Sequence, residues 1–192
     1  MIIGIGYRAH SGKDSIGKIL VYRYGFYRIA FADILKDATS VLCYGLVLRS
    51  VRQPEFKEGI TPFGLTGGQL LQRVGTALRE AVPGIFIEAS HLTQMGLTYP
   101  DLVITDVRHL DEAKAIKDLG GILIEVRRYV PQDDHVSETE GAKIKWDHVI
   151  ENNGSLVDLE AKVVALMASL GRSPLPFGVA SDSPQALSVP AS

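Results

Sequence analysis

The chain is short of cysteine, since Cys43 is the only one among its 192 residues. An internal disulfide is therefore impossible, and a metal cluster held by several thiolates is excluded, which fits a reducing compartment. Long apolar runs are also missing, because no 18 consecutive residues are both apolar and uncharged, and the run over residues 1–6 is too short for a secretory signal. We therefore expect a cytoplasmic protein that does not enter a membrane.

An excess of basic charge is missing as well, since 20 basic and 22 acidic residues give a formal net charge of −2. A protein that binds a nucleic-acid polymer usually carries a basic excess or a basic stripe, so we do not expect such a partner. The charge balance does not exclude small anionic ligands, because they need only a few well-placed cations. The hydrophobic content of 46% indicates a folded chain with an apolar core, and the length suits one domain.

Short apolar runs alternate with helical patterns along most of the chain. The apolar runs predict strands over residues 2–6, 27–31, 102–106, 122–126 and 148–150. The helical spacing of apolar residues predicts helices over residues 14–24, 32–44, 67–81, 85–95, 111–119 and from Ser155 onward. This alternation predicts an α/β fold of three layers, in which a five-stranded parallel sheet is covered by helices on both faces.

Two segments lack this periodicity. Residues 49–68 are rich in Pro, Gly and charge and are predicted to form a loop. Residues 171–192 hold many prolines and serines and are predicted to be a disordered tail outside the fold. We therefore expect one domain over residues 1–170.

The turn after the first predicted strand carries Ser11-Gly12-Lys13-Asp14-Ser15 and leads into a helix. Backbone N–H groups at a helix N-terminus bind anions, helped by the helix dipole. In such a loop the glycine lets the backbone approach phosphate, the lysine contacts the β- and γ-phosphates, and the hydroxyl is offered to Mg²⁺. The pattern predicts a P-loop that binds a nucleoside triphosphate with magnesium; a chance turn that caps a helix is the alternative.

One position departs from the usual phosphate-loop pattern. The residue five positions before Gly12 is Tyr7, where the pattern has glycine, and the glycine stands one position earlier, at Gly6. Two explanations stay open: the loop is one residue longer, or Tyr7 takes the first-glycine position with altered dihedral angles.

A second polar group follows another strand. Asp106 ends the strand predicted over residues 102–106, which we expect beside the first strand, and Arg108 follows two residues later. A carboxylate at that place holds magnesium or its water in enzymes that transfer or hydrolyse nucleotide phosphates. A guanidinium there suits a phosphate of the acceptor. The alternative for Asp106 is a cap of the following turn.

Arg127 and Arg128 follow the fourth predicted strand and open a polar stretch, residues 127–147, that we interpret as a lid. A lid closes over the phosphates, excludes water and brings cations to the transferred group. An exposed strand end is the alternative for the arginine pair.

Further candidates lie on elements that could form an acceptor pocket, within helices over residues 45–98 or close by. These residues are Lys36, Gln72, Arg73 and Arg79. The turn Asn152-Asn153-Gly154 follows the last strand and is a candidate contact for the base of the donor nucleotide, although Asn-Gly turn chemistry explains it equally well.

These motifs together resemble phage-type deoxynucleoside monophosphate kinases. The segments that carry the resemblance are Gly12-Lys13-Asp14-Ser15, Phe31-Ala32-Asp33-Ile34-Leu35-Lys36, Leu70-Leu71-Gln72-Arg73-Val74-Gly75-Thr76, Ile104-Thr105-Asp106-Val107-Arg108, Glu112-Ala113, Gly120-Gly121, His135-Val136-Ser137-Glu138, Asp147 and Ile150-Glu151-Asn152-Asn153-Gly154. They stand in the family's order over about residues 1–168.

The resemblance implies a nucleoside-monophosphate-kinase-like P-loop fold and transfer of the ATP γ-phosphate to a deoxynucleoside monophosphate. It implies Lys13 and Ser15 as phosphate and magnesium ligands, Asp106 and Arg108 at the reacting centre, and the two arginines after the fourth strand in the lid. It leaves the acceptor base open, allows a homodimer, and would place a phage-encoded protein in the host cytoplasm. Two alternatives remain: a P-loop kinase of another phosphorylated small molecule, such as phosphomevalonate, and a nucleotide-binding module without catalysis.

Overall fold

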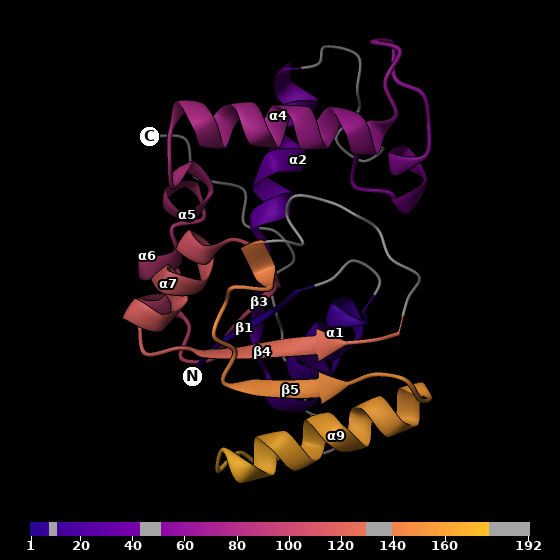
Figure 1. Cartoon of the computed structure of the whole chain (residues 1–192). Coiled ribbons are helices and arrows are strands. Elements are labelled where there is room, and N and C mark those ends of the chain that lie inside the picture. Colours follow the sequence, from indigo (N-terminus) through magenta and orange to yellow (C-terminus); the bar gives the residue numbers. More distant parts are fainter. Residues whose placement is uncertain (8–10, 43–50, 130–139, 177–192) are drawn as a thin grey trace.

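The computed structural model describes residues 1–7, 11–42, 51–129 and 140–176 (Figure 1). Its strands are β1 (Ile2–Tyr7), β2 (Tyr27–Ile29), β3 (Leu102–Val107), β4 (Ile122–Arg127) and β5 (His148–Glu151). Its helices are α1 (Lys13–Tyr24), α2 (Phe31–Leu42), the 3₁₀ helix η1 (Pro54–Lys57), α4 (Gly67–Ala81), α5 (Ile85–Ala89), α6 (Leu92–Thr98), α7 (Leu110–Asp118) and α9 (Leu156–Ser169).

The five strands form one parallel sheet in the order β2-β3-β1-β4-β5. The first strand is central, so that Ile3 pairs with Val103 on one side and with Ile122 on the other. This sheet and its helices confirm the predicted α/β fold. Because all the strands run the same way, their carboxyl ends share one edge of the sheet, and ligands of such folds bind at this edge.

Two apolar cores cover the two faces of the sheet, which gives the three layers. One core contains Ile16 and Leu20 of α1 and Leu159 of α9, packed on the strands. The other contains Phe31 of α2 and Ile116 of α7 together with residues of α5 and α6. Figure 1 shows α9 along one side of β5, and α2 with α4 on the opposite side of the molecule.

Close backbone approaches explain two of the glycines. A Cβ on Gly17 would lie 2.5 Å from Cγ2 of Thr105, so this glycine lets α1 pack tightly on β3. A Cβ on Gly6 would lie 2.2 Å from the carbonyl oxygen of Val107 and 2.3 Å from Cη2 of Trp146. The phosphate loop therefore starts from a strand end with no room for a side chain.

Most predicted elements are confirmed, with three differences in detail. The helix predicted over residues 85–95 is two helices, α5 and α6, separated at His91, whose φ of 49° is left-handed. The strand β2 stops at Ile29, because helix α2 already begins at Phe31. The loop predicted over residues 49–68 contains η1 and an isolated bridge between Ile60 and Thr66.

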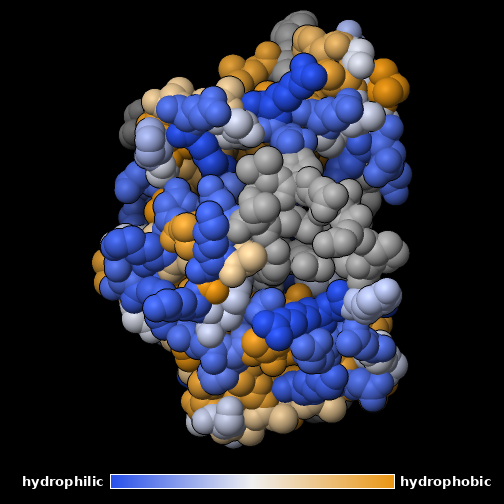
Figure 2. All heavy atoms as spheres, in the orientation of Figure 1, coloured by the Kyte–Doolittle hydropathy of each residue, from blue (hydrophilic) through white to orange (hydrophobic). Residues whose placement is uncertain are grey.

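The surface of the molecule is largely hydrophilic in the view of Figure 2, with apolar areas towards its upper and lower ends. Among the described residues, Ile60 and Phe63 between η1 and α4 are exposed, as are Leu156 and Val157 at the start of α9. Within the described ranges, no helix combines the length and the apolar character that crossing a bilayer requires. The homodimer stays a prediction.

The described chain remains packed beyond residue 170, where the sequence predicts the end of the domain. Arg172 forms an ion pair with Asp101, and the backbone N–H of Leu175 donates to the carbonyl oxygen of Arg23 at 2.7 Å. Residues 177–192, the rest of the predicted tail, lie outside the described residues.

Candidate active site

The predicted phosphate loop lies at the carboxyl end of β1, in the centre of the sheet. Gly12 is the N-cap of α1 and has a φ of 103°, a left-handed value that favours glycine. Its carbonyl oxygen accepts the N–H of Ile16 at 3.1 Å and so starts the helix. Ser11 is fully buried, and Ser15 lies in the first turn of α1. The strand, loop and helix thus follow one another as an anion site requires.

The structure describes the end of the strand that precedes the phosphate loop, where the glycine is displaced. The backbone of Tyr7 belongs to β1 and pairs with Val126 of β4, so Tyr7 continues the strand. The path of the loop over residues 8–10 lies outside the described residues.

Lys13 is the most perturbed cation of this region. Its side chain is buried, with 7% of its surface exposed, and the pKa of its ammonium group is lowered from 10.5 to about 8. Desolvation is the main cause, and the positive charge of Arg108 is the second, while Asp14 and Asp106 act in the opposite direction. An anion such as a triphosphate would offset both main causes, because its negative charge stabilises the charged form of a poorly solvated cation.

Asp106 lies at the end of β3, beside β1, and its carboxylate caps a helix from another part of the chain. The N–H groups of Phe31 and Ala32 donate to its two oxygens at 2.9 and 2.6 Å, so Asp106 satisfies the first turn of α2. Burial raises the pKa of this carboxyl, and the two hydrogen bonds and the charge of Arg108 oppose the rise. The predicted capping alternative is thus partly realised, but on α2 and not on the turn that follows Asp106.

The donor set around this carboxylate is compatible with magnesium. Mg²⁺ usually keeps several waters and takes one or two protein ligands together with substrate phosphates, so it needs no cage of protein carboxylates. No cluster of three or more His, Cys, Asp or Glu side chains is found where the structure is described. Each carboxylate oxygen of Asp106 accepts one backbone N–H and can accept a further bond or ligand, and Ser15 carries a hydroxyl in the first turn of α1.

Arg108 follows β3 and acts electrostatically on Lys13 and on Lys57. Lys57, at the end of η1, is the functional candidate that sequence reasoning missed. Its pKa is lowered by desolvation and then by Arg108 and Lys36, which places three cations near one another. No sequence signal pointed to Lys57, since it lies in a segment that reads as a loop with surface charge.

The predicted acceptor residues do not form one cluster. Lys36 pairs with Asp33 at 3.3 Å, and Gln72 and Arg73 are exposed on α4. Arg79, in contrast, pairs with Glu112 and lies over the ring of Phe86, with 4.5 Å between its Cζ and the ring centroid. The charge of Lys36 helps to lower the pKa of Lys57, which places these two lysines near each other.

The two predicted lid arginines differ in their surroundings. Arg127 donates through Nε and Nη2 to the two oxygens of Glu125 at 3.0 and 2.8 Å, in a fork that holds it along β4. Arg128 is exposed. Residues 130–139, which make up most of the predicted lid, lie outside the described residues.

The final part of the predicted lid range belongs to the core. Ile144 is buried in the core with α7, and the carboxylate of Asp147 accepts the N–H of Leu123 at 2.7 Å. Trp146 packs at the end of β1, against Gly6. A lid, if it forms, is therefore anchored at its second end beside the phosphate loop.

The turn after β5 lies against the phosphate loop. The side-chain amide of Asn152 is buried and donates to the carbonyl oxygen of Ser11 at 2.8 Å. Asn153 accepts the N–H of Tyr129 at 2.9 Å, and a Cβ on Gly154 would lie 2.6 Å from Oδ2 of Asp158. The turn was predicted to contact the donor base; the structure places Asn152 as a support of the loop backbone.

Known proteins are similar to this chain in sequence and in fold. The family model described as "Deoxynucleotide monophosphate kinase" matches residues 72–163. A "Putative deoxynucleotide monophosphate kinase" of Acanthamoeba polyphaga mimivirus is 35% identical over 192 residues, which cover 86% of this chain and 95% of the viral protein.

Solved structures with a similar fold include TT1252 from Thermus thermophilus, with a TM-score of 0.51, 21% identity, and coverage of 88% of this chain and 97% of that one. Shikimate kinase from Aquifex aeolicus gives a TM-score of 0.48 at 11% identity, with 89% and 98% of the two chains covered. The first likeness supports the fold alone, whereas the viral relative is similar over nearly its whole length. The chain therefore belongs to the deoxynucleotide monophosphate kinase family and is a kinase.

Proposed function

We propose that the chain transfers the γ-phosphate of ATP, with magnesium, to a deoxynucleoside 5′-monophosphate and so forms a deoxynucleoside diphosphate and ADP. The observation that carries the proposal is the meeting of Lys13, Arg108 and Asp106 where the adjacent strands β1 and β3 end, at the N-terminus of α1. This set supplies two cations and a carboxylate beside an anion-binding helix end, which suits phosphoryl transfer.

Each group has a distinct task in the proposed mechanism. The backbone of residues 11–15 cradles the donor phosphates, and Lys13 neutralises charge on the β- and γ-phosphates. Arg108 orients the acceptor phosphate and spreads the charge of the transferred group. Magnesium, held by Ser15, Asp106 and phosphate oxygens, would supply further charge neutralisation.

The acceptor is itself a phosphate that is largely ionised at neutral pH, so transfer needs no strong general base. Orientation and charge neutralisation then carry most of the rate acceleration, and the transfer is direct and in line. Lys36, Gln72 and Arg73 are proposed to bind the acceptor, and Arg127 and Arg128 to act from the lid. Asn152, Asn153 and Gly154 are proposed to form the donor side, with Asn152 acting through the loop backbone.

The test is a coupled assay of ADP release with ATP, magnesium and each common deoxynucleoside and ribonucleoside monophosphate in turn. Turnover with one or more deoxynucleotides is expected and would name the accepted base. Lys13→Ala should abolish this turnover, whereas Lys18→Ala, an exposed lysine of the same helix, should not. ATP binding without turnover on any monophosphate would contradict the proposal and favour a different phosphorylated acceptor or a binding module.

A further inference from the structure

Glu112 is a carboxylate in an unusual place, because it lies in the first turn of α7 with only 1% of its surface exposed. Glutamate is almost never fully buried unless it is paired. Its Oε2 accepts the backbone N–H groups of Arg108 at 2.9 Å and His109 at 3.1 Å, and its Oε1 accepts a hydrogen bond from Nη2 of Arg79. The two carboxylate oxygens of Glu112 therefore accept hydrogen bonds from two different segments of the protein.

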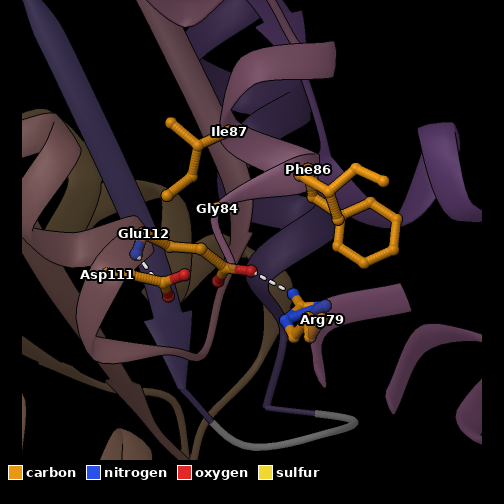
Figure 3. Close-up of a pocket in the computed structure, with 7 residues that line it drawn as sticks. Arg79, Gly84, Phe86, Ile87, Asp111 and Glu112 are labelled. Carbon is orange, nitrogen blue, oxygen red and sulfur yellow. Dashed lines mark hydrogen bonds and ion pairs between the residues drawn. The ribbon is translucent and has the colours of Figure 1, made fainter. Parts of the chain in front are cut away.

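Arg79 lies on α4 and precedes Glu112 by 33 residues in the sequence. Its guanidinium lies over the ring of Phe86 of α5, and Figure 3 shows the two side chains near each other, with Arg79 paired to Glu112; the ring contact helps to orient the donors of Arg79. Asp111 also contributes, since its Oδ1 accepts the N–H of Glu112 at 2.8 Å. The pair is therefore held from both sides.

A simple helix cap does not require this arrangement. Glu112 at the third position of α7 would satisfy the backbone of residues 108 and 109 without a buried arginine. Taking an ion pair out of water carries a desolvation cost that an apolar pair of similar volume avoids, so such pairs are weak devices for stability. A buried ion pair is better explained when it holds one conformation of the chain. Here the pair holds the turn that carries Arg108.

We propose that Glu112 is a positioning residue for phosphoryl transfer, which ties the backbone of Arg108 to helix α4 through Arg79. The link rests on the proposed function, because Arg108 is the group that it places beside Lys13. In this arrangement Arg79 serves Glu112 and does not contact the acceptor. Since α4 also carries the exposed Gln72 and Arg73, the link joins the predicted acceptor helix to the reacting centre.

The burial of this carboxylate is electrostatically balanced by its neighbours. Desolvation raises the pKa of Glu112 and the charge of Asp106 adds to the rise, while His109, Arg79 and the N–H of Arg108 oppose it. Removing Arg79 therefore leaves a buried carboxylate with backbone donors only, and its neutral form becomes more favourable. The hydrogen bonds to residues 108 and 109 should weaken in that case, because a neutral acid is a poorer acceptor.

The experiment compares Glu112→Gln and Arg79→Met with the wild type and with Glu80→Gln, an exposed glutamate next to Arg79 on α4. Steady-state kinetics give kcat and the KM values for ATP and for the accepted monophosphate, and amide hydrogen exchange reports on residues 107–110. We expect kcat to fall about 10- to 100-fold in both variants, as displacement of a reacting group by about 1 Å can cause. The KM for ATP should stay within about twofold, and the amides of residues 108 and 109 should exchange faster while β1 is unchanged.

Three results would overturn the proposal. Wild-type kcat in either variant would remove the positioning role, and equal loss of kcat and of ATP affinity would indicate general damage to the fold. Unchanged exchange at residues 108 and 109 would show that the link does not hold that turn. If Glu112→Gln does not fold, Arg79→Met alone decides, since Arg79 is partly exposed. Failure of the proposed function is distinguishable, because the wild type would then turn over no deoxynucleotide in the same assay.

Discussion

The side-chain amide of Asn152 donates to the carbonyl oxygen of Ser11 at 2.8 Å and thereby fastens the turn after β5 to the phosphate loop. The two residues are 141 positions apart, and both are buried. The same amide nitrogen would lie 2.2 Å from a Cβ on Gly12. The turn after the last strand of the sheet is therefore tied to Ser11, just before helix α1.

Asn152→Ala should destabilise the protein by about 1–3 kcal/mol, because it removes a buried hydrogen bond between the side-chain amide and the carbonyl oxygen of Ser11. It should also weaken ATP binding, since the loop backbone loses its support. Urea unfolding and titration of the fluorescence of Trp146, the only tryptophan, measure the two effects. Unchanged stability together with unchanged ATP affinity would contradict the supporting role.

Gly12→Ala tests the same contact from the other side. The new Cβ would collide with Asn152, and the φ of 103° would cost about 1–3 kcal/mol in addition for a residue other than glycine. We expect ATP binding to be lost. The double variant Gly12→Ala, Asn152→Ala removes the collision but not the backbone strain, so it should regain stability only in part. Full recovery would show that the left-handed backbone is not needed.

Asp106→Asn should lower both stability and activity. An amide can accept only through its oxygen, so one of the N–H groups of Phe31 and Ala32 loses its acceptor, at a cost of about 1–3 kcal/mol. If Asp106 also helps to hold magnesium, the Mg²⁺ concentration for half-maximal rate should rise. The matched control is Asp118→Asn, an exposed carboxylate paired with Lys114, whose unfolding free energy should stay within about 0.5 kcal/mol of the wild type. An unchanged magnesium requirement would assign Asp106 to the α2 cap alone.

The fold was predictable because its signals are local. Short apolar runs, the glycine at Gly25 that ends α1 with a φ of 73°, and the Ser155–Asp158 capping box each depend on a few neighbouring residues. The predicted bounds of α4 agree with the structure because the helical spacing of its apolar residues is also a local signal, and the structure adds a capping box of Thr66 and Gln69 at its start.

The site was predictable only where a motif carried it. Lys13, Asp106 and Arg108 come from spaced motifs at strand ends, and the parallel sheet brings them together. Lys57 is influenced by Arg108 and by Lys36, 51 and 21 positions away, and Glu112 binds Arg79, 33 positions away, so no local sequence pattern indicates these contacts. The partner of Arg79 was missed for the same reason, because an arginine on an amphipathic helix looks like surface charge from sequence.

Arg127 and Arg128 form a matched pair for a test of the lid. Arg127→Met should lower the melting temperature, since Glu125, only 8% exposed, loses the fork that satisfies both of its oxygens. Arg128→Met should leave the melting temperature within about 1 °C, because substitutions away from buried contacts cost little. If Arg128 reaches the transferred group, its variant should nevertheless lose kcat. Equal stability losses, or full activity of Arg128→Met, would contradict this division.

Truncation should locate the real end of the folded domain. Removing residues 171–192 deletes the ion pair of Arg172 with Asp101 and the hydrogen bond from Leu175 to Arg23. We expect the melting temperature to fall by a few degrees, since about 1 kcal/mol corresponds to about 2–4 °C in a chain of this size. Removing only residues 177–192 keeps these contacts and should leave the melting temperature unchanged. Equal melting temperatures of the two truncations would place the end of the domain at residue 170.

The lowered pKa of Lys13 makes ATP binding depend on pH. In the free enzyme the ammonium group loses its proton near pH 8, so above that pH a triphosphate must bind with uptake of a proton. The value of kcat/KM for ATP, which reports on the free enzyme, should fall up to tenfold per unit above about pH 8. The fall in kcat should begin at higher pH, because bound phosphate raises the pKa again.

The same shift has a defined sign for stability. The pKa of Lys13 is lower in the folded chain than in the unfolded one, so the charged form is disfavoured by folding. This penalty is fully present below about pH 8 and is relieved as the pH rises towards 10.5, the ordinary value. Calorimetric titration of ATP at pH 8.5 in two buffers of different ionisation enthalpy should show proton uptake, which Lys13→Arg should abolish, since arginine stays charged. Equal heats in the two buffers for the wild type would contradict the assignment of a pKa near 8 to this lysine.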